Sequence, residues 1–352
     1  MTEPRASLGA TLASDVREST TSIRAGHGPL PSVAMSRRLL VLGWHNIDPT
    51  PFYPAAPGAG RRGFDRQLAA IDRLATVVPL SEAVDTLAAG GSLPPRAVAL
   101  TFDDGYADWT EAAVPALDRR GMHGTFFLVS DILAGRIGAW WEELADAFDR
   151  CSASRLEWAG RVHDLSTPVA RRAAQDALKD ELKLVDRATR VEAVARIAER
   201  IAPPPPERAP LFLDWAGAEA LAATGHGIGS HTVTHPILAR EEEATQRHEL
   251  EESRHALEAG LGQTVDLLAY PNGNAGDYDQ RTMELARAAG YRAAVTTRPG
   301  LVGAQEPQYA MHRVVLTPLT DVGELFGKVA RKGTGVARRV AHRAFRTLTP
   351  TG

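Results

Sequence analysis

The sequence predicts a parallel α/β protein, and three observations lead to this fold class. Short apolar runs of strand length recur along the chain. Between them stand segments whose apolar residues have helical spacing. Several of the apolar runs end in polar side chains, as strands do at the functional edge of parallel sheets. Strands that alternate with helices favour a parallel sheet covered by helices.

The stretch Ala97–Tyr106 is the most informative of these runs. Its apolar residues predict a buried strand, and Asp103 and Asp104 follow at the carboxyl end of that strand. Gly105 allows the backbone to turn there and to approach a ligand closely. Two solvated aspartates in a turn would give the same local pattern. This stretch therefore indicates a functional site only if a second half of the site exists elsewhere.

The composition is that of an ordinary soluble globular protein, with 44% hydrophobic and 24% charged residues among 352. The formal net charge of −3 gives no indication of nucleic acid or an acidic polymer as a partner. The single cysteine, Cys151, excludes an internal disulfide framework and a multi-cysteine metal cluster. No apolar run reaches the roughly 20 residues that span a bilayer.

Both ends of the chain differ in composition from the middle. Residues 1–36 are rich in Ser, Thr and Gly and lack the apolar core of a signal peptide, so we expect disorder, with Met35 as an alternative start. Residues 37–323 are expected to form the folded domain. Residues 324–352 are a basic tail in which Lys and Arg alternate with apolar residues. The tail is either solvated or in peripheral contact with an anionic membrane surface.

In the first part of the domain, strands and helices are expected to alternate. The predicted strands are 39–45, 77–78, 97–103 and 125–129. The predicted helices are 64–75, a helix capped by Ser81 that ends at Gly90, and 109–120, which is closed by Gly121. Residues 49–60 contain four prolines and predict an irregular loop at the carboxyl edge of the sheet.

Residues 138–210 interrupt the alternation and predict a mostly helical insertion. A helix is expected over 140–149, and Thr167 with Pro168 is expected to begin one long helix that runs towards Ile201. The alternation then resumes. The later predicted elements are helices over 215–224 (capped by Asp214), 240–260 and 279–289, and strands over 225–231, 265–270, 293–297 and 311–316.

His231 and His235 stand four residues apart, after one of these later strands. In a helical turn both imidazoles fall on one face and can hold one metal ion. In a chain with 11 histidines this spacing is common by chance. Together with one aspartate of the Asp-Asp-Gly stretch, the pair makes a three-ligand site with open positions, as catalytic zinc sites require. The other aspartate is then free to act as a general base on a water molecule.

These two motifs resemble those of the polysaccharide deacetylases of the NodB-homology class, also grouped as the fourth family of carbohydrate esterases. Thr101–Gly105 (TFDDG) matches the family's first motif, and Ser230–His235 (SHTVTH) matches its second. The resemblance covers roughly residues 39–321 without the helical insertion. The two motifs in this order are highly specific to the family.

The resemblance implies a distorted (β/α)7-type barrel that hydrolyses the N-acetyl group of an amino sugar. It implies three metal ligands, Asp104, His231 and His235, with Zn²⁺ as the default divalent metal. It implies that Asp103 is the catalytic base that activates a metal-bound water. The backbone N–H of Tyr106 is expected to help hold the oxyanion.

The chain departs from the family pattern at two later motifs. Ala269 stands where the family has an arginine that orients the base, and Arg313 is a candidate substitute from a neighbouring strand end. The family's last motif supplies a histidine that protonates the leaving amine. His312 is the best candidate for this acid, and His45 is the alternative. The residues assigned to the substrate side are Trp44, His45, Tyr106, Tyr270, Pro271, Asn272 and Arg313.

The leading hypothesis is therefore a metal-dependent N-deacetylase that acts on an acetylated amino-sugar glycan or its precursor. An amidase or esterase with a non-sugar acyl substrate would use the same site. A sugar-binding protein with degenerate chemistry is the third hypothesis, because the motif arginine is missing. Without an export signal, a cytoplasmic location, peripheral at the inner membrane face through the basic tail, is favoured.

Overall fold

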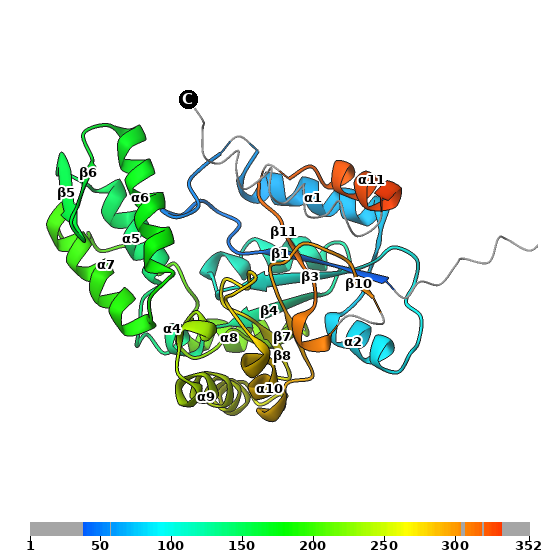
Figure 1. Ribbon diagram of the computed structural model, residues 1–352. Coiled ribbons are helices and arrows are strands. Elements are labelled where there is room, and N and C mark those ends of the chain that lie inside the picture. Colours follow the sequence, from blue (N-terminus) through cyan, green and yellow to red (C-terminus); the bar gives the residue numbers. More distant parts are fainter. Residues whose placement is uncertain (1–37, 57, 304–306, 319, 333–352) are drawn as a thin grey trace, which may run out of the picture. The chain divides into compact units, whose positions relative to one another are not determined.

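The computed structural model describes residues 38–56, 58–303, 307–318 and 320–332. The segment expected to be disordered (1–36) and most of the basic tail lie outside these residues. Within them, no helix combines the length and the apolar character that crossing a membrane requires. Figure 1 shows a central sheet with helices on its outer side and a separate group of helices, α5 to α7, beside it.

The strands and helices follow the predicted order closely. The strands are β1 (Arg38–Trp44), β2 (Thr76–Val77), β3 (Ala97–Asp103), β4 (Gly124–Leu128), β5 (Arg155–Trp158), β6 (Arg161–Asp164), β7 (Gly227–Ser230), β8 (Leu267–Ala269), β9 (Ala293–Val295), β10 (Val302–Gly303) and β11 (Val314–Val315). The α-helices are α1 (Gly60–Leu74), α2 (Leu80–Ala88), α3 (Ala113–Asp118), α4 (Ser130–Leu133), α5 (Trp140–Asp149), α6 (Pro168–Leu182), α7 (Arg187–Ile201), α8 (Trp215–Ala222), α9 (Glu243–Leu261), α10 (Gln280–Ala288) and α11 (Val322–Lys332). Short 3-10 turns are η1 (Ala107–Trp109), η2 (Leu238–Arg240) and η3 (Gln308–Ala310).

The central sheet curls into a distorted barrel of parallel strands. Its order is β1, β3, β4, β7, β8, β9, and each of these neighbouring pairs is parallel. The segment after η3 lies between the two ends of this row. Met311 bridges to Val295 of β9, and β11 pairs in parallel with Leu42 and Gly43 of β1. The expected (β/α)7-type barrel is thus confirmed.

Side chains alternate between the two faces of each barrel strand. In β3, Ala97 and Ala99 belong to the apolar cluster inside the barrel, whereas Phe102 packs outward against the helices. The same alternation turns Thr101 and Asp103 inward at the carboxyl end. Helix α2 contributes buried residues to the interior apolar cluster from the amino end, and Thr101 and Asp103 lie at the carboxyl end.

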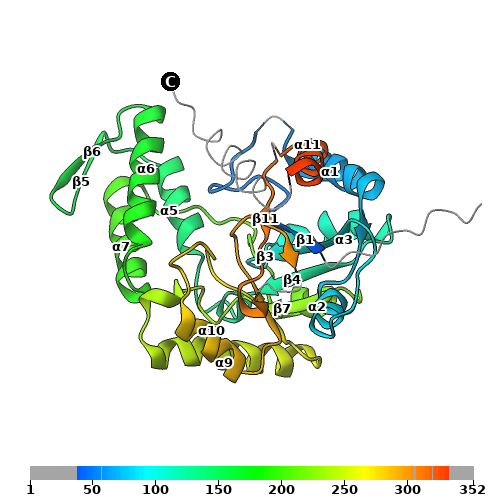
Figure 2. The ribbon, with the colours of Figure 1, turned by 45° about the vertical axis from the view of Figure 1, so that its right-hand side comes forward.

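The helices outside the barrel form two groups (Figure 2). Helix α1 contacts α3 and α11 on one side of the sheet, and α9 contacts α8, α10 and β7 on another. Val322 and Leu325 of α11 belong to the main apolar cluster. The boundary expected at residue 324 therefore falls inside a helix that is part of the folded domain.

The insertion folds around an apolar cluster of its own, built from α5, α6, α7 and the β5–β6 hairpin. Thr167 caps α6 as predicted. The prediction of one long helix towards Ile201 is wrong, because the chain turns after α6 and Asp186 caps a second helix, α7. The hairpin was not predicted, although its turn has left-handed Ala159 and Gly160, the conformation that two-residue hairpin turns require.

The predicted helix caps have mixed outcomes. Asp214 caps α8 as predicted, accepting the Gly217 N–H, whereas Asp279, which was predicted as part of the helix, caps α10 by accepting the Thr282 N–H. Ser81 does not cap α2, because the helix already begins at Leu80, directly after Pro79. The single helix expected over 109–120 is divided into η1 and α3.

Candidate active site

The Asp-Asp-Gly stretch leaves the barrel in a tight turn at the end of β3. Asp104 and Gly105 both have left-handed backbone conformations, with φ of 85° and 88°. Asp tolerates this region better than most residues, and Gly adopts it freely. The turn lets the Asp103 carboxylate stay inside the barrel while the Asp104 carboxylate meets the loop after β7. Both side chains are almost fully buried.

The loop after β7 carries both histidines, but it is not the helical turn that was expected. Thr232 and His235 are left-handed, with φ of 71° and 56°. The Thr232 hydroxyl accepts a hydrogen bond from the His235 N–H at 3.1 Å. This bent loop, rather than helical spacing, turns His231 and His235 towards the same point.

The buried carboxylate of Glu249, on α9, anchors this loop. It accepts hydrogen bonds from the backbone N–H groups of Val233 and Thr234, at 2.8 Å each, and one from the Thr234 hydroxyl. Burial raises the pKa of Glu249, and these hydrogen bonds oppose the rise. The histidine loop is therefore held by a neighbouring helix as well as by its own turn.

Asp104, His231 and His235 form a candidate metal centre. The Nε2 atoms of His231 and His235 lie 3.3 and 3.4 Å from Asp104 Oδ1, and one ligand atom from each residue lies within 4.8 Å of the others. Ligands about 2.0–2.1 Å from a tetrahedral ion are about 3.4 Å apart, so the cluster fits a cation such as Zn²⁺. His231 Nδ1 is 2.7 Å from the Ala269 carbonyl oxygen. When it donates there, Nε2 is left as the ligand atom.

The electrostatics of the cluster suit a cation. Burial alone would raise the pKa of Asp104, but its hydrogen bonds with His231 and His235 hold it well below the usual range. Burial lowers the pKa of both histidines and Asp104 raises it. The balance raises the pKa of His231 and lowers that of His235 to about 4. At neutral pH the carboxylate is thus ionised and His235 is neutral, the forms in which these groups bind metals.

The other aspartate, Asp103, is paired with an arginine from the end of the barrel. Arg313 Nη1 donates to Asp103 Oδ1 at 2.6 Å, and Nη2 donates to Oδ2. The guanidinium is fully buried and also donates to the Thr101 hydroxyl and the Thr296 carbonyl. Burial raises the pKa of Asp103, but Arg313 and nearby imidazoles lower it overall. The residue predicted to replace the missing arginine therefore contacts the predicted base.

His45, at the end of β1, faces the same charges. Burial lowers the pKa of His45 more than Asp104 and Asp103 raise it. The Trp109 indole donates to the His45 carbonyl at 2.6 Å, and the imidazole lies 5.4 Å from the Tyr53 ring, centroid to centroid. A neutral histidine is thus held beside the two aspartates by its backbone and by an aromatic neighbour.

Helix α5 of the insertion forms a wall of the site that sequence reasoning missed. The Trp141 ring lies 4.4 Å from the His235 ring, and its indole donates to the Tyr106 hydroxyl at 3.0 Å. The Tyr106 hydroxyl donates to Glu142 Oε1 at 2.8 Å. Tyr53, from the proline-rich loop, lies 6.3 Å from the Tyr106 ring. The sequence signal was a pair of tryptophans followed by two acids at a helix start, in a segment predicted only as a mostly helical insertion.

Two residues predicted to line the sugar site are in the core instead. Trp44 is 4% exposed and donates its indole N–H to Gln67 at 3.0 Å. Tyr270 is fully buried and stacks on Tyr278. Both predictions are wrong for one reason: alternation along β1 and β8 turns these side chains outward, under the helices.

The remaining predicted residues lie at the rim or beyond it. Pro271 is buried, and Asn272 is half-buried in a left-handed turn, with φ of 56°; their contact with a sugar stays a prediction. Alternation places His312 on the opposite side of its segment from Arg313. His312 Nδ1 is 3.1 Å from the Arg298 carbonyl oxygen. This placement argues against His312 as the acid.

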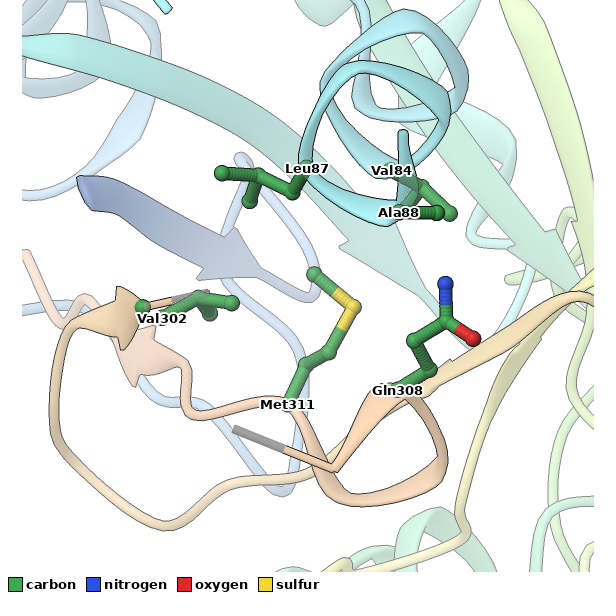
Figure 3. A pocket seen from close by; sticks show the side chains of 7 residues that line it. Val84, Leu87, Ala88, Val302, Gln308 and Met311 are labelled. Atoms are coloured by element: carbon green, nitrogen blue, oxygen red, sulfur yellow. The ribbon is translucent and has the colours of Figure 1, made fainter. Parts of the chain in front are cut away.

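A separate hollow of about 380 Å³ lies near the amino end of β1, beside α2 (Figure 3). Its lining residues are Val84, Leu87, Ala88, Val302, Gly303, Gln308 and Met311. None of these seven residues is titratable. The hollow lies at the other end of the barrel from Asp103 and is no part of the candidate active site.

The fold and the site together define a parallel barrel protein with a buried cluster of one aspartate and two histidines, which could hold a metal ion, at the carboxyl end of its strands. A family model described as Polysaccharide deacetylase matches residues 90–155 and 184–294. The chain belongs to the polysaccharide deacetylase family. The matched region includes both aspartates and both histidines, and it ends before Arg313.

Individual relatives are distant. The curated protein YxkH of Bacillus subtilis (strain 168), named for the same family, is 23% identical over 232 residues. The alignment covers 66% of this chain and 55% of YxkH, so this chain spans about half the length of that relative.

Two solved structures share the fold. The deacetylase PplD of Streptococcus pyogenes has a TM-score of 0.54 at 18% identity, covering 82% of this chain and 97% of PplD. IcaB from Ammonifex degensii has a TM-score of 0.51 at 21% identity, covering 86% of this chain and 97% of IcaB. These likenesses place the described barrel among deacetylase folds.

Proposed function

We propose that this protein is a metal-dependent N-deacetylase that removes acetyl groups from amino sugars in a glycan or glycan precursor. The observation that carries the proposal is the buried Asp103–Arg313 pair beside the Asp104, His231 and His235 cluster. Membership in the polysaccharide deacetylase family supports it. Acetate, with which PplD was solved, is the product that this reaction would release.

Asp104, His231 and His235 would hold the divalent cation, and we propose Zn²⁺. A cation bound there polarises a carbonyl oxygen and lowers the pKa of a water molecule. Three protein ligands leave further coordination positions open, as catalytic zinc sites do and structural sites do not.

Asp103 is the proposed general base. Its depressed pKa keeps the carboxylate ionised, so it can accept a proton from water as the water oxygen adds to the acetyl carbon. Arg313 donates to both carboxylate oxygens and fixes their plane. Each oxygen keeps a second lone pair for the proton in transit.

The backbone N–H of Tyr106 is the proposed donor to the oxyanion. Residues 105–107 pair with 211–213 in an antiparallel bridge. The Leu213 N–H donates to the Gly105 carbonyl and the Ala107 N–H to the Leu211 carbonyl, at 2.8 Å each. In this pattern the N–H of the central residue points away from the partner segment, so it is available to a ligand.

The leaving amine needs a proton, and His45 is the proposed relay that delivers it from Asp103. It lies in the field of Asp103 and Asp104, whereas the ring of His312 is directed to Arg298. When the tetrahedral adduct collapses, the C–N bond breaks and the neutral His45 imidazole passes a ring proton to the amine nitrogen, while its other ring nitrogen takes up the proton that Asp103 accepted from water. The products are acetate and the free amino sugar, which balances the reaction with one water consumed.

The test combines metal analysis with acetate release from N-acetylglucosamine oligomers, for the wild type, His231→Ala and Asp103→Asn. We expect about one zinc per chain in the wild type and in Asp103→Asn, and a loss of zinc in His231→Ala. Acetate release should fall about 10²–10⁴-fold in Asp103→Asn. His255→Ala, an exposed histidine on α9, is the matched control and should change neither quantity.

Two results would contradict the proposal in different ways. Zinc retained at full occupancy in His231→Ala would remove the proposed metal site. Zinc bound normally with no acetate released from any acetylated sugar would leave the metal site standing but reject the sugar substrate. Turnover of aryl acetates in that case would point to a non-sugar esterase.

A further inference from the structure

Glu142 is a buried carboxylate that joins three segments around the candidate site. Its side chain is on α5 of the insertion, and the residue is only 3% exposed. Oε1 accepts from the Thr50 hydroxyl at 2.7 Å and from the Tyr106 hydroxyl at 2.8 Å. Oε2 accepts from the Phe52 N–H at 3.0 Å. Figure 1 shows the loop after β1 running from the barrel to the insertion, where these contacts are made.

Each of the joined segments carries a group of the candidate site. The segment 50–53 ends in Tyr53, whose ring lies against His45. Tyr106 follows the metal-binding turn directly, and its backbone N–H is the proposed oxyanion donor. The neighbour of Glu142 on α5, Trp141, contacts the His235 ring and donates to the Tyr106 hydroxyl. Two adjacent residues of α5, Trp141 and Glu142, therefore contact His235, Tyr106 and the 50–53 segment.

Burying the Glu142 carboxylate costs free energy that an apolar side chain at this position would not cost. The hydrogen bonds described for Glu142 all come from neutral donors, and burial raises its pKa. A buried acid without a paired cation destabilises a fold compared with an apolar side chain of similar size. Other buried residues of α5, among them Trp140, Leu144 and Phe148, already pack the apolar cluster of the insertion. Packing of the insertion does not explain an acid at this position.

We propose that Glu142 is a positioning residue that sets the 50–53 loop and the Tyr106 peptide relative to the metal centre. The insertion then contributes a positioning residue to the active site. The effect on turnover rests on the proposed deacetylase function. The contacts of Glu142 with Thr50, Phe52 and Tyr106, here called the Glu142 clamp, are a property of the fold and can be measured without substrate.

The kinetic test compares Glu142→Ala, Glu142→Gln and the matched control Glu143→Gln, which changes an exposed acid one position further along α5. For Glu142→Ala, we expect a fall of about 10–100-fold in kcat/KM, the usual effect of losing a residue that orients ligating and catalytic groups. Both a higher KM and a lower kcat per bound zinc should contribute. Glu142→Gln keeps one acceptor oxygen and should restore part of the loss. Glu143→Gln should match the wild type.

The values of KM and of kcat per bound zinc distinguish a positioning role of Glu142 from a merely structural one. A structural defect lowers the fraction of folded, metal-loaded protein but leaves KM and kcat per bound zinc unchanged. Glu142→Ala with wild-type values of both constants would overturn the proposal. If Glu142→Ala does not fold, Thr50→Val removes one arm of the clamp from the loop side and should raise KM in the same direction. Wild-type constants in Thr50→Val and Glu142→Gln together would also overturn it.

Hydrogen exchange tests the clamp in the absence of turnover. Glu142 accepts the Phe52 N–H, so amide exchange in a peptide covering residues 50–53 should speed up at least tenfold in Glu142→Ala, while a barrel peptide such as 124–128 keeps its protection. Unchanged exchange in 50–53 would overturn the proposal. If the wild type releases acetate from no sugar, the proposed function fails. The exchange result still shows whether Glu142 holds the 50–53 loop.

Discussion

At the scale of single residues, the pairing of Asp103 with Arg313 decides the chemistry of the site. A buried carboxylate is normally pushed towards its neutral form by desolvation. Here the fully buried guanidinium supplies two parallel hydrogen bonds and a full positive charge, which together with the nearby His231 and His45 imidazoles outweigh that effect. Asp103, the proposed base, is therefore kept ionised, and Arg313 fixes the plane of its carboxylate.

Arg313→Lys should shift the acidic limb of the pH profile of kcat/KM to higher pH. Arg313 depresses the pKa of Asp103 in the folded protein. Lysine cannot make the bidentate pair, so this pKa rises and the base becomes protonated sooner as the pH falls. Activity should therefore be lost at a higher pH than in the wild type. Arg298→Lys, whose side chain contacts Tyr278 instead, is the control and should keep the wild-type profile.

The same substitution has a stability consequence of definite sign. Asp103 has a folded pKa below its unfolded value, so its contribution to stability is present above the unfolded pKa and is lost as the pH falls through the folded pKa. The loss of unfolding free energy in Arg313→Lys should therefore shrink on acidification. A pH-independent difference between the two proteins would contradict this account of the pair.

At the scale of elements, the histidine loop depends on a helix that supplies no metal ligand. Two left-handed non-glycine residues, Thr232 and His235, make the loop a strained conformation. Glu249 of α9 holds it through two backbone N–H groups and one hydroxyl. The orientation of His235 is thus set by a side chain 14 positions further along the chain, on a different element.

Glu249→Ala should weaken zinc binding about 10–100-fold while the barrel stays folded, because the loop loses its anchor but keeps its ligands. Competition with a zinc chelator measures the affinity directly. Glu252→Ala, an exposed acid on the same helix, should bind zinc as the wild type does. Equal affinity in Glu249→Ala and Glu252→Ala would show that the loop holds its shape without this contact.

At the scale of the whole molecule, two regions outside the short motifs complete the site. The segment 311–316 joins the ends of the sheet and brings in Arg313, although the family match stops at residue 294. The insertion contributes Trp141 and Glu142 from a cluster with its own buried core. The active site therefore depends on how distant parts of the chain pack, and core changes in the insertion should reach it.

Leu178→Ala, in the centre of α6, should lower the unfolding free energy by about 2–5 kcal/mol, because Leu178 is fully buried in the insertion. Leu184→Ala, the same substitution at a residue that is 66% exposed, should change it by less than about 0.5 kcal/mol. Urea unfolding followed by circular dichroism measures both. Equal midpoints for the two variants would mean that the insertion core does not contribute to the stability of the domain.

The fold class, the order of most strands and helices, and the residues of the candidate metal cluster could be predicted from the sequence. These follow from local patterns: apolar runs of strand length, helical spacing, and two short motifs whose residues stand next to one another or four apart. The His231 and His235 pairing was recognised even though the helical turn proposed for it was wrong, because the motif survives a change in local backbone.

The tertiary structure alone decided which side chains reach the site from elsewhere. Asp103 and Arg313 are 210 positions apart and meet only because the last strand closes the barrel. Trp44 and Tyr270 were placed at the mouth from their position at strand ends, but alternation directs them into the core. Glu142 belongs to an insertion whose approach to the barrel depends on packing between helices. Spacing along a chain defines neighbours within one element, whereas barrel closure and insertion docking are set by contacts between residues far apart in the chain.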